Sequence, residues 1–131
     1  DCLKEGSDIT IISFGAMLEE AFAAETLLRK HNINATLIDA KFLKPLDEEM
    51  LLGMQNSKLI CILEDNAKSG GLGEAIAIFY ADRGICPKLL NITLPDKKIT
   101  HASVKEQRAL YGVDAKTITE KILNALNISN K

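Results

Sequence analysis

An acidic pair followed by a glycine-rich segment is the part of the sequence whose residue types best suit chemistry. Glu64 and Asp65 end an apolar run, and Gly70, Gly71 and Gly73 follow within a few residues. Carboxylates at the end of a strand can act as acids or bases, and the free N–H groups at a glycine-rich helix start can hold a phosphate. This segment is therefore the first candidate for a functional site.

The glycines do not complete a nucleotide-binding motif. A dinucleotide fingerprint needs a third glycine where Ile76 stands and should follow the first strand, and a P-loop needs Gly-Lys-Ser/Thr. Glu64 likewise lacks a complete acid–base constellation. We therefore favour close backbone packing for the glycines and solvated or backbone-bonded carboxylates. We predict no catalytic, cofactor-binding or metal-ligating residue in this chain.

The histidines and cysteines point the same way. His31 is expected to finish a helix, and His101, in an irregular segment, can contact a phosphate or a neighbouring domain, although a surface or packing role is favoured. Three widely spaced cysteines without a Cys-x-x-Cys pair argue against disulfides and zinc, and they favour a cytoplasmic protein. Cys61, within an apolar run, is predicted to be a buried residue rather than a nucleophile.

Composition excludes several classes of protein. The chain has 131 residues, 47% of them hydrophobic, and a net charge of -2, and its apolar runs are too short to cross a bilayer. With no basic stripe and few aromatic residues, nucleic acid is not an expected partner. We predict one domain over residues 1–131 with its core at about 7–126. Because the sequence does not begin with Met, we expect a fragment of a longer polypeptide.

Strands and helices alternate along the chain. The apolar strand-like runs lie at 8–14, 35–40, 58–63 and 88–92. Amphipathic or capped helices are predicted at 17–31, after the N-cap Asp47, at 72–84, from Ser103 to Leu110, and from Asp114 or Thr117 to about Leu126. This alternation predicts a layered α/β domain with a mostly parallel sheet of four or five strands, which positions Glu64 at a strand's carboxyl end.

Several segments together resemble the C-terminal domain of the transketolase family, which also occurs in the beta subunits of 2-oxo acid dehydrogenases. Two later segments resemble most the 1-deoxy-D-xylulose-5-phosphate synthases of that family, although Lys41, Lys97 and Ala102 depart from their usual pattern. The segments shared by the whole family are Glu5–Gly15, Ile38–Asp47, Leu63–Asn66 and Gly70–Gly73, and the two later ones are Leu94–His101 and Tyr111–Ala115.

The resemblance implies a three-layer α/β/α sandwich around a five-stranded mixed sheet with one antiparallel strand. It implies a thiamine-diphosphate-dependent transferase that condenses pyruvate with glyceraldehyde 3-phosphate, feeding isoprenoid and thiamine synthesis. In this family the cofactor and its magnesium are held by the preceding domains, which also contain the glutamate that activates the cofactor. Glu64 is therefore not given that role.

The resemblance also implies that the C-terminal domain packs on the preceding domains and contributes to a homodimer, so the isolated fragment is expected to be inactive and to bind no cofactor. Contacts with another domain or subunit are assigned to Glu64, Gly70, Gly71, Gly73 and His101. The alternatives are the equivalent domain of a transketolase or of a dehydrogenase beta subunit, and a stand-alone module that binds a small anion at the glycine-rich helix start.

Overall fold

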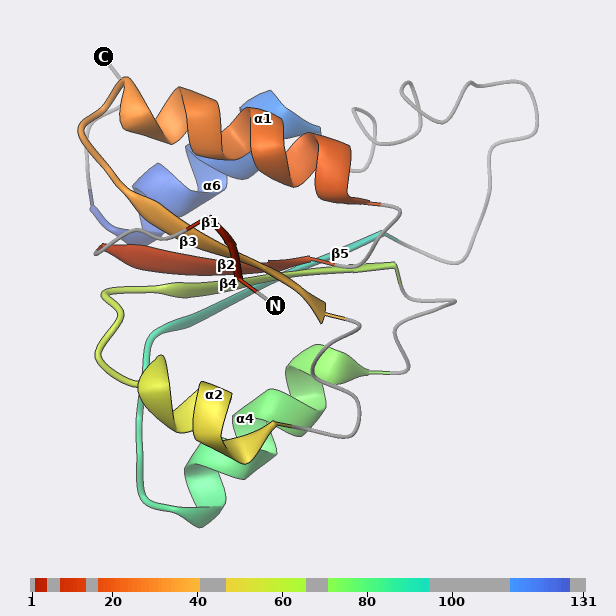
Figure 1. The fold of residues 1–131 in the computed structure, drawn as a ribbon, viewed down its shortest axis with the longest axis vertical. Helices are drawn as coiled ribbons and strands as arrows, with labels where there is room; N and C mark the ends of the chain where they lie inside the picture. Colours follow the sequence, from red (N-terminus) through yellow and green to blue (C-terminus); the bar gives the residue numbers. More distant parts are fainter. Residues whose placement is uncertain are drawn as a thin grey trace.

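A five-stranded sheet lies between two layers of helices (Figure 1). The computed structural model describes residues 2–4, 8–13, 17–40, 47–65, 71–94 and 114–127. The strands are β1 (Cys2–Lys4), β2 (Ile9–Ser13), β3 (Ala35–Asp39), β4 (Ile60–Asp65) and β5 (Leu89–Leu94). The helices are α1 (Leu18–Arg29), α2 (Glu48–Gly53), α4 (Leu72–Asp82) and α6 (Ala115–Ala125).

The strand order is β1-β3-β2-β4-β5. Strands β2 to β5 are parallel to one another, and β1 runs antiparallel to β3 at the edge. The predicted α/β sandwich, with one antiparallel strand, is therefore confirmed. The pattern of residues had indicated only the four parallel strands. Strand β1 has three residues, too few to show an alternation, and its pairing with β3 defines it.

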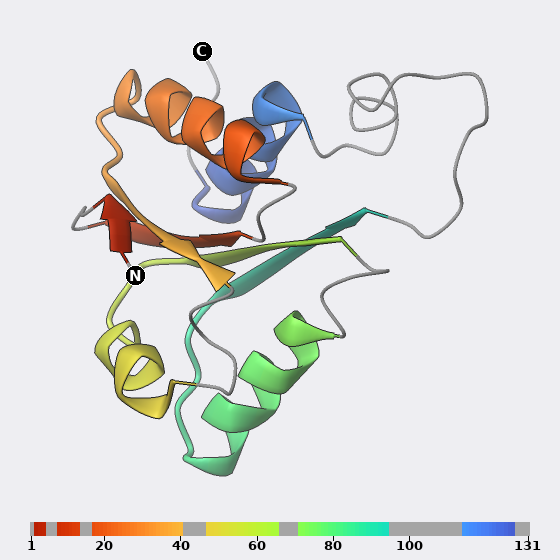
Figure 2. The ribbon, with the colours of Figure 1, turned by 45° about the vertical axis from the view of Figure 1, so that its right-hand side comes forward.

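Each face of the sheet is covered by one pair of helices. Helices α1 and α6 cover one face, and α2 and α4 cover the other (Figures 1 and 2). Successive side chains alternate between the two cores: Cys61 points into the α1/α6 core, and Ile60 and Ile62 point into the α2/α4 core. This double burial explains why the central strands read as continuous apolar runs. Among the described helices, none is both long enough and apolar enough to cross a membrane.

The predicted helix caps are present where the structure describes them. The Asp47 carboxylate accepts a hydrogen bond from the Met50 N–H, and the Asp114 carboxylate accepts one from the Thr117 N–H, both at 3.0 Å. Each thus satisfies a free donor at the start of its helix. The predicted helix from Ser103 to Leu110 lies outside the described residues.

Candidate functional site

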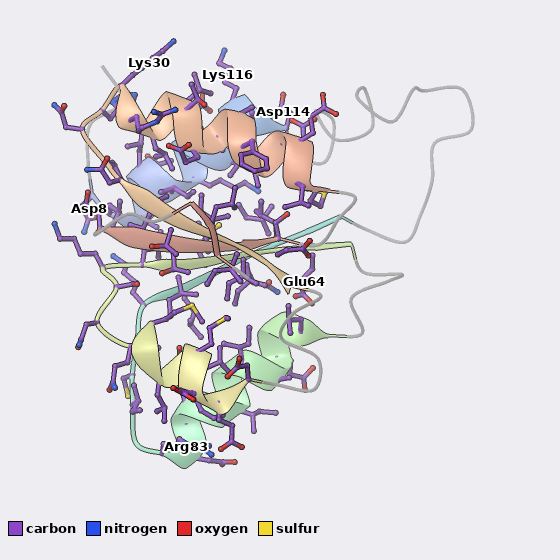
Figure 3. The ribbon with its side chains drawn as sticks, in the orientation of Figure 1. Asp8, Lys30, Glu64, Arg83, Asp114 and Lys116 are labelled. Atoms are coloured by element: carbon purple, nitrogen blue, oxygen red, sulfur yellow. The ribbon has the colours of Figure 1, made fainter. Side chains whose placement is uncertain are left out.

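Glu64 lies near the carboxyl end of β4, where the sequence had suggested chemistry (Figure 3). Its side chain is only 3% exposed and lies on the same face of the strand as Ile62, toward the α2/α4 layer. The carboxylate has a polar partner within the protein. A buried charge requires such compensation. Of the two alternatives favoured from the sequence, solvated or backbone-bonded, the solvated carboxylate is therefore wrong for Glu64.

Gly73, in the first turn of α4, shows what Glu64 contacts. A Cβ placed on Gly73 would lie 2.7 Å from Glu64 Oε2 and 2.6 Å from Asn91 Oδ1. Both distances are shorter than real Cβ contacts, so any side chain at position 73 would force the ends of the Glu64 and Asn91 side chains to shift. The prediction that glycine permits close packing is confirmed here. The carboxylate also lies at the positive end of the α4 dipole, which stabilises its negative charge.

Gly71 turns the chain into α4. Its φ of 78° and ψ of 38° are left-handed, a conformation that glycine adopts without strain. It precedes the helix without a side-chain cap, and its carbonyl accepts a hydrogen bond from the Ala75 N–H at 3.0 Å. The two described glycines of the motif thus serve different needs, a backbone turn at Gly71 and a close approach at Gly73.

The structure brings together only part of the predicted set. Glu64 and Gly73 meet, whereas Gly70 and His101 lie outside the described residues. The reading of the sequence missed Asn91, on β5. Its signal was strand pairing: Glu64 is opposite position 93 in the register of β4 and β5, so Asn91, two residues earlier on β5, lies diagonally across from Glu64.

The described part of this junction disfavours a bound diphosphate. The Glu64 carboxylate already lies at the α4 N-terminus, so a second anion there would face a like charge. Within the described part of the chain, no group of three or more His, Cys, Asp or Glu side chains is arranged to bind a metal ion. Cys61 is fully buried, and this burial raises the pKa of its thiol to about 12, so it carries no reactive thiolate near neutral pH.

At the other end of the central strands, where they begin, lies a cavity of about 320 Å³, lined in part by Asp8, His31 and Lys58. The Asp8 carboxylate accepts a hydrogen bond from the Asn34 N–H at 2.7 Å and pairs with Lys58 Nζ at 3.5 Å. The hydrogen bond, more than the lysine, lowers the pKa of Asp8. These bonds join the starts of three strands, and His31 lies in the turn that ends α1, as predicted. Internal bonds hold this end of the sheet together, and ligand sites in open parallel sheets usually lie at the other end, beyond the carboxyl ends of the strands.

Comparisons with known proteins identify this arrangement. The family model described as "Transketolase, C-terminal domain" matches residues 1–118. The 1-deoxy-D-xylulose-5-phosphate synthases of Syntrophotalea carbinolica and Caldanaerobacter subterraneus subsp. tengcongensis are 32% and 35% identical over 95% and 94% of this chain. The chain spans 20% of the length of each of them.

Two solved structures share the fold. A split-gene transketolase, described as an inactive beta4 tetramer, has a TM-score of 0.82 and 26% identity over 98% of this chain and 42% of its own. A transketolase from Pichia stipitis has a TM-score of 0.67 and 16% identity, over 97% of this chain and 18% of its own. The family model that matches residues 1–118, together with these relatives, shows that this chain belongs to the transketolase C-terminal domain family.

Proposed function

We propose that this chain is the C-terminal domain of a thiamine-diphosphate-dependent 1-deoxy-D-xylulose-5-phosphate synthase. The observation that carries the proposal is the set of synthases that are 32% to 35% identical over nearly the whole chain, each matched over about a fifth of its own length. The complete enzyme would condense pyruvate, with loss of CO₂, with glyceraldehyde 3-phosphate.

In this proposal the domain is structural. The described residues supply no metal-binding cluster. The start of α4, which follows the glycine-rich segment, already faces the Glu64 carboxylate. Thiamine diphosphate and magnesium would be held by the other domains. The junction of Glu64, Gly71 and Gly73, with Gly70 and His101, would contact a neighbouring domain or the second subunit of a homodimer.

Calorimetric titration tests this division of labour. Thiamine diphosphate with Mg²⁺ should give no binding heat with this chain alone. Binding should appear when the chain is coexpressed with the cofactor-binding domains of the same genome. The assembled protein should then release CO₂ from pyruvate in the presence of glyceraldehyde 3-phosphate. Tight cofactor binding by the isolated chain would contradict the proposal.

A second candidate is the equivalent domain of a transketolase or of a dehydrogenase beta subunit. The split-gene transketolase favours it, because that protein shares the fold at 26% identity. The same assembled protein distinguishes the two, since a transketolase would use xylulose 5-phosphate, the sugar phosphate named with the Pichia stipitis structure, instead of pyruvate.

A stand-alone anion-binding module is disfavoured by the position of Glu64. An anion at the α4 start would have to approach a buried carboxylate. Inorganic phosphate titrated into the labelled chain should therefore leave the amide resonances of Gly71 and Gly73 unshifted. Saturable shifts confined to these two residues would revive this alternative.

A further inference from the structure

Helix α4 is apolar on both sides. Its inner side packs into the core through buried residues that include Leu72, Ile76 and Phe79. Ala77, Ile78 and Ala81 are exposed on the opposite side, at the spacing that places residues on one face of a helix. We call these three residues the outer stripe. A helix that is apolar all round is typical of one covered on both sides.

Ile78 is the most exposed large hydrophobic side chain in the described part of the chain, at 53%. The two flanking alanines are small, so another backbone can approach the helix closely there. Leu52, on α2 in the same layer, is also 37% exposed. The α2/α4 layer therefore presents apolar surface outward in addition to the surface that it buries against the sheet.

The charges around the outer stripe indicate what kind of surface covers it. Glu74 and Asp82 flank the stripe at its two ends, and both side chains are exposed. Arg83 is the one basic residue within 47–53 and 71–83, whereas these segments hold five acidic ones. This arginine already pairs with Glu48 at 3.1 Å and lies 3.8 Å above the Phe79 ring. The surface is thus acidic around an apolar centre.

A second copy of α4 would be a poor partner for this surface. If two copies packed antiparallel, Glu74 of each would lie near Asp82 of the other. If they packed parallel, identical acids would lie side by side. Like charges in apposition cost free energy in both arrangements, and a rim of Lys or Arg would be complementary.

We propose that the outer stripe docks an apolar protein segment flanked by Lys or Arg, in another domain of the complete enzyme. This inference rests on the proposed function. The curated relatives extend well beyond this chain, which spans 20% of their length, so most of such an enzyme lies outside the segment described. Docking would remove the exposed Ile78 side chain from water and neutralise the acids at both ends of the stripe.

The test uses this chain coexpressed with the domains that precede it in its relatives, taken from the same genome. Ile78→Lys and Glu74→Lys should each weaken the association by about tenfold or more, because a buried anchor or a complementary charge is lost. Phe22→Lys is the matched control, since Phe22 is 37% exposed on α1 and should leave the association unchanged. A photoreactive residue at position 78 should cross-link to a Lys- or Arg-flanked segment, and one at position 22 should not.

The outcomes separate the two proposals. Association that survives both α4 substitutions, or a cross-link from position 78 to a second copy of α4, overturns this inference and leaves the proposed function intact. If the wild-type chain does not associate with those domains, the proposed function fails and this inference fails with it.

Discussion

The two helical layers bury similar apolar cores, and they differ on their outer sides. Helix α1 exposes Glu19, Thr26 and Arg29, and its exposed apolar side chains are Phe22 and Ala23. Even the buried Glu25 is paired, with Arg29 at 2.6 Å. Helix α4 instead exposes the outer stripe. The two layers thus differ in degree: Ile78 on α4 is 53% exposed, whereas Phe22 on α1 is 37% exposed and has polar neighbours on most sides.

Within each layer, a hydrogen bond ties the two helices together. The Tyr80 hydroxyl donates to the Leu51 carbonyl, which joins α4 to α2. The Ala115 N–H at the start of α6 donates to Glu20 Oε2 at 3.0 Å, which joins α6 to α1. Only the first of these bonds is buried. Water can therefore replace the bond between α1 and α6 more easily than the bond between α2 and α4. The layers differ in this respect as well as in their outer surfaces.

The largest expected effect on stability concerns the packing of α4 against the sheet at Gly73. Gly73→Ala should lower the free energy of unfolding by about 1 to 3 kcal/mol, because the new methyl group would force the end of the buried Glu64 side chain to shift, together with that of Asn91. Gly53→Ala is the control, since no atom lies within 4 Å of a Cβ there. It should be neutral or stabilising by up to about 1 kcal/mol. Urea unfolding of both variants measures the difference. Equal stability of the two variants would show that Glu64 and Asn91 do not pack closely against position 73.

A smaller effect is expected from the hydrogen bonds within the layers. Tyr80→Phe should cost about 1 kcal/mol, because the buried Leu51 carbonyl loses this bond and keeps only the one from the Met54 N–H at 3.2 Å. Glu20→Ala should cost less than about 1 kcal/mol, since water can reach the partly exposed Ala115 N–H. Thermal unfolding by circular dichroism should rank the two variants in this order. The reverse ranking would contradict the difference in burial between the layers.

The smallest effect should come from the outer stripe in the isolated chain. Ile78→Lys and Phe22→Lys should each change the free energy of unfolding by no more than about 0.5 kcal/mol, because both side chains are exposed. Chemical unfolding of the isolated chain checks this. A cost well above that for Ile78→Lys alone would place Ile78 in the core of the folded chain and remove the contrast between the layers.

Local patterns determined much of the fold. The apolar runs placed the four parallel strands. Asp47 marked the start of α2, and Asp114 was one of the two starts expected for α6, because a cap depends on residues three positions apart. The glycine-rich segment also indicated the start of α4. Its missing third glycine argued against nucleotide binding without any structure.

Only the tertiary structure decided what the junction contains. Asn91 meets Gly73 because β5 pairs with β4, and nothing local to either residue encodes that pairing. Strand β1 is defined in the same way, by its pairing with β3. The sequence shows only that α4 is rich in apolar residues. The packing of the sheet decided which side is buried and left Ile78 facing outward, since a residue's burial depends on what folds against it.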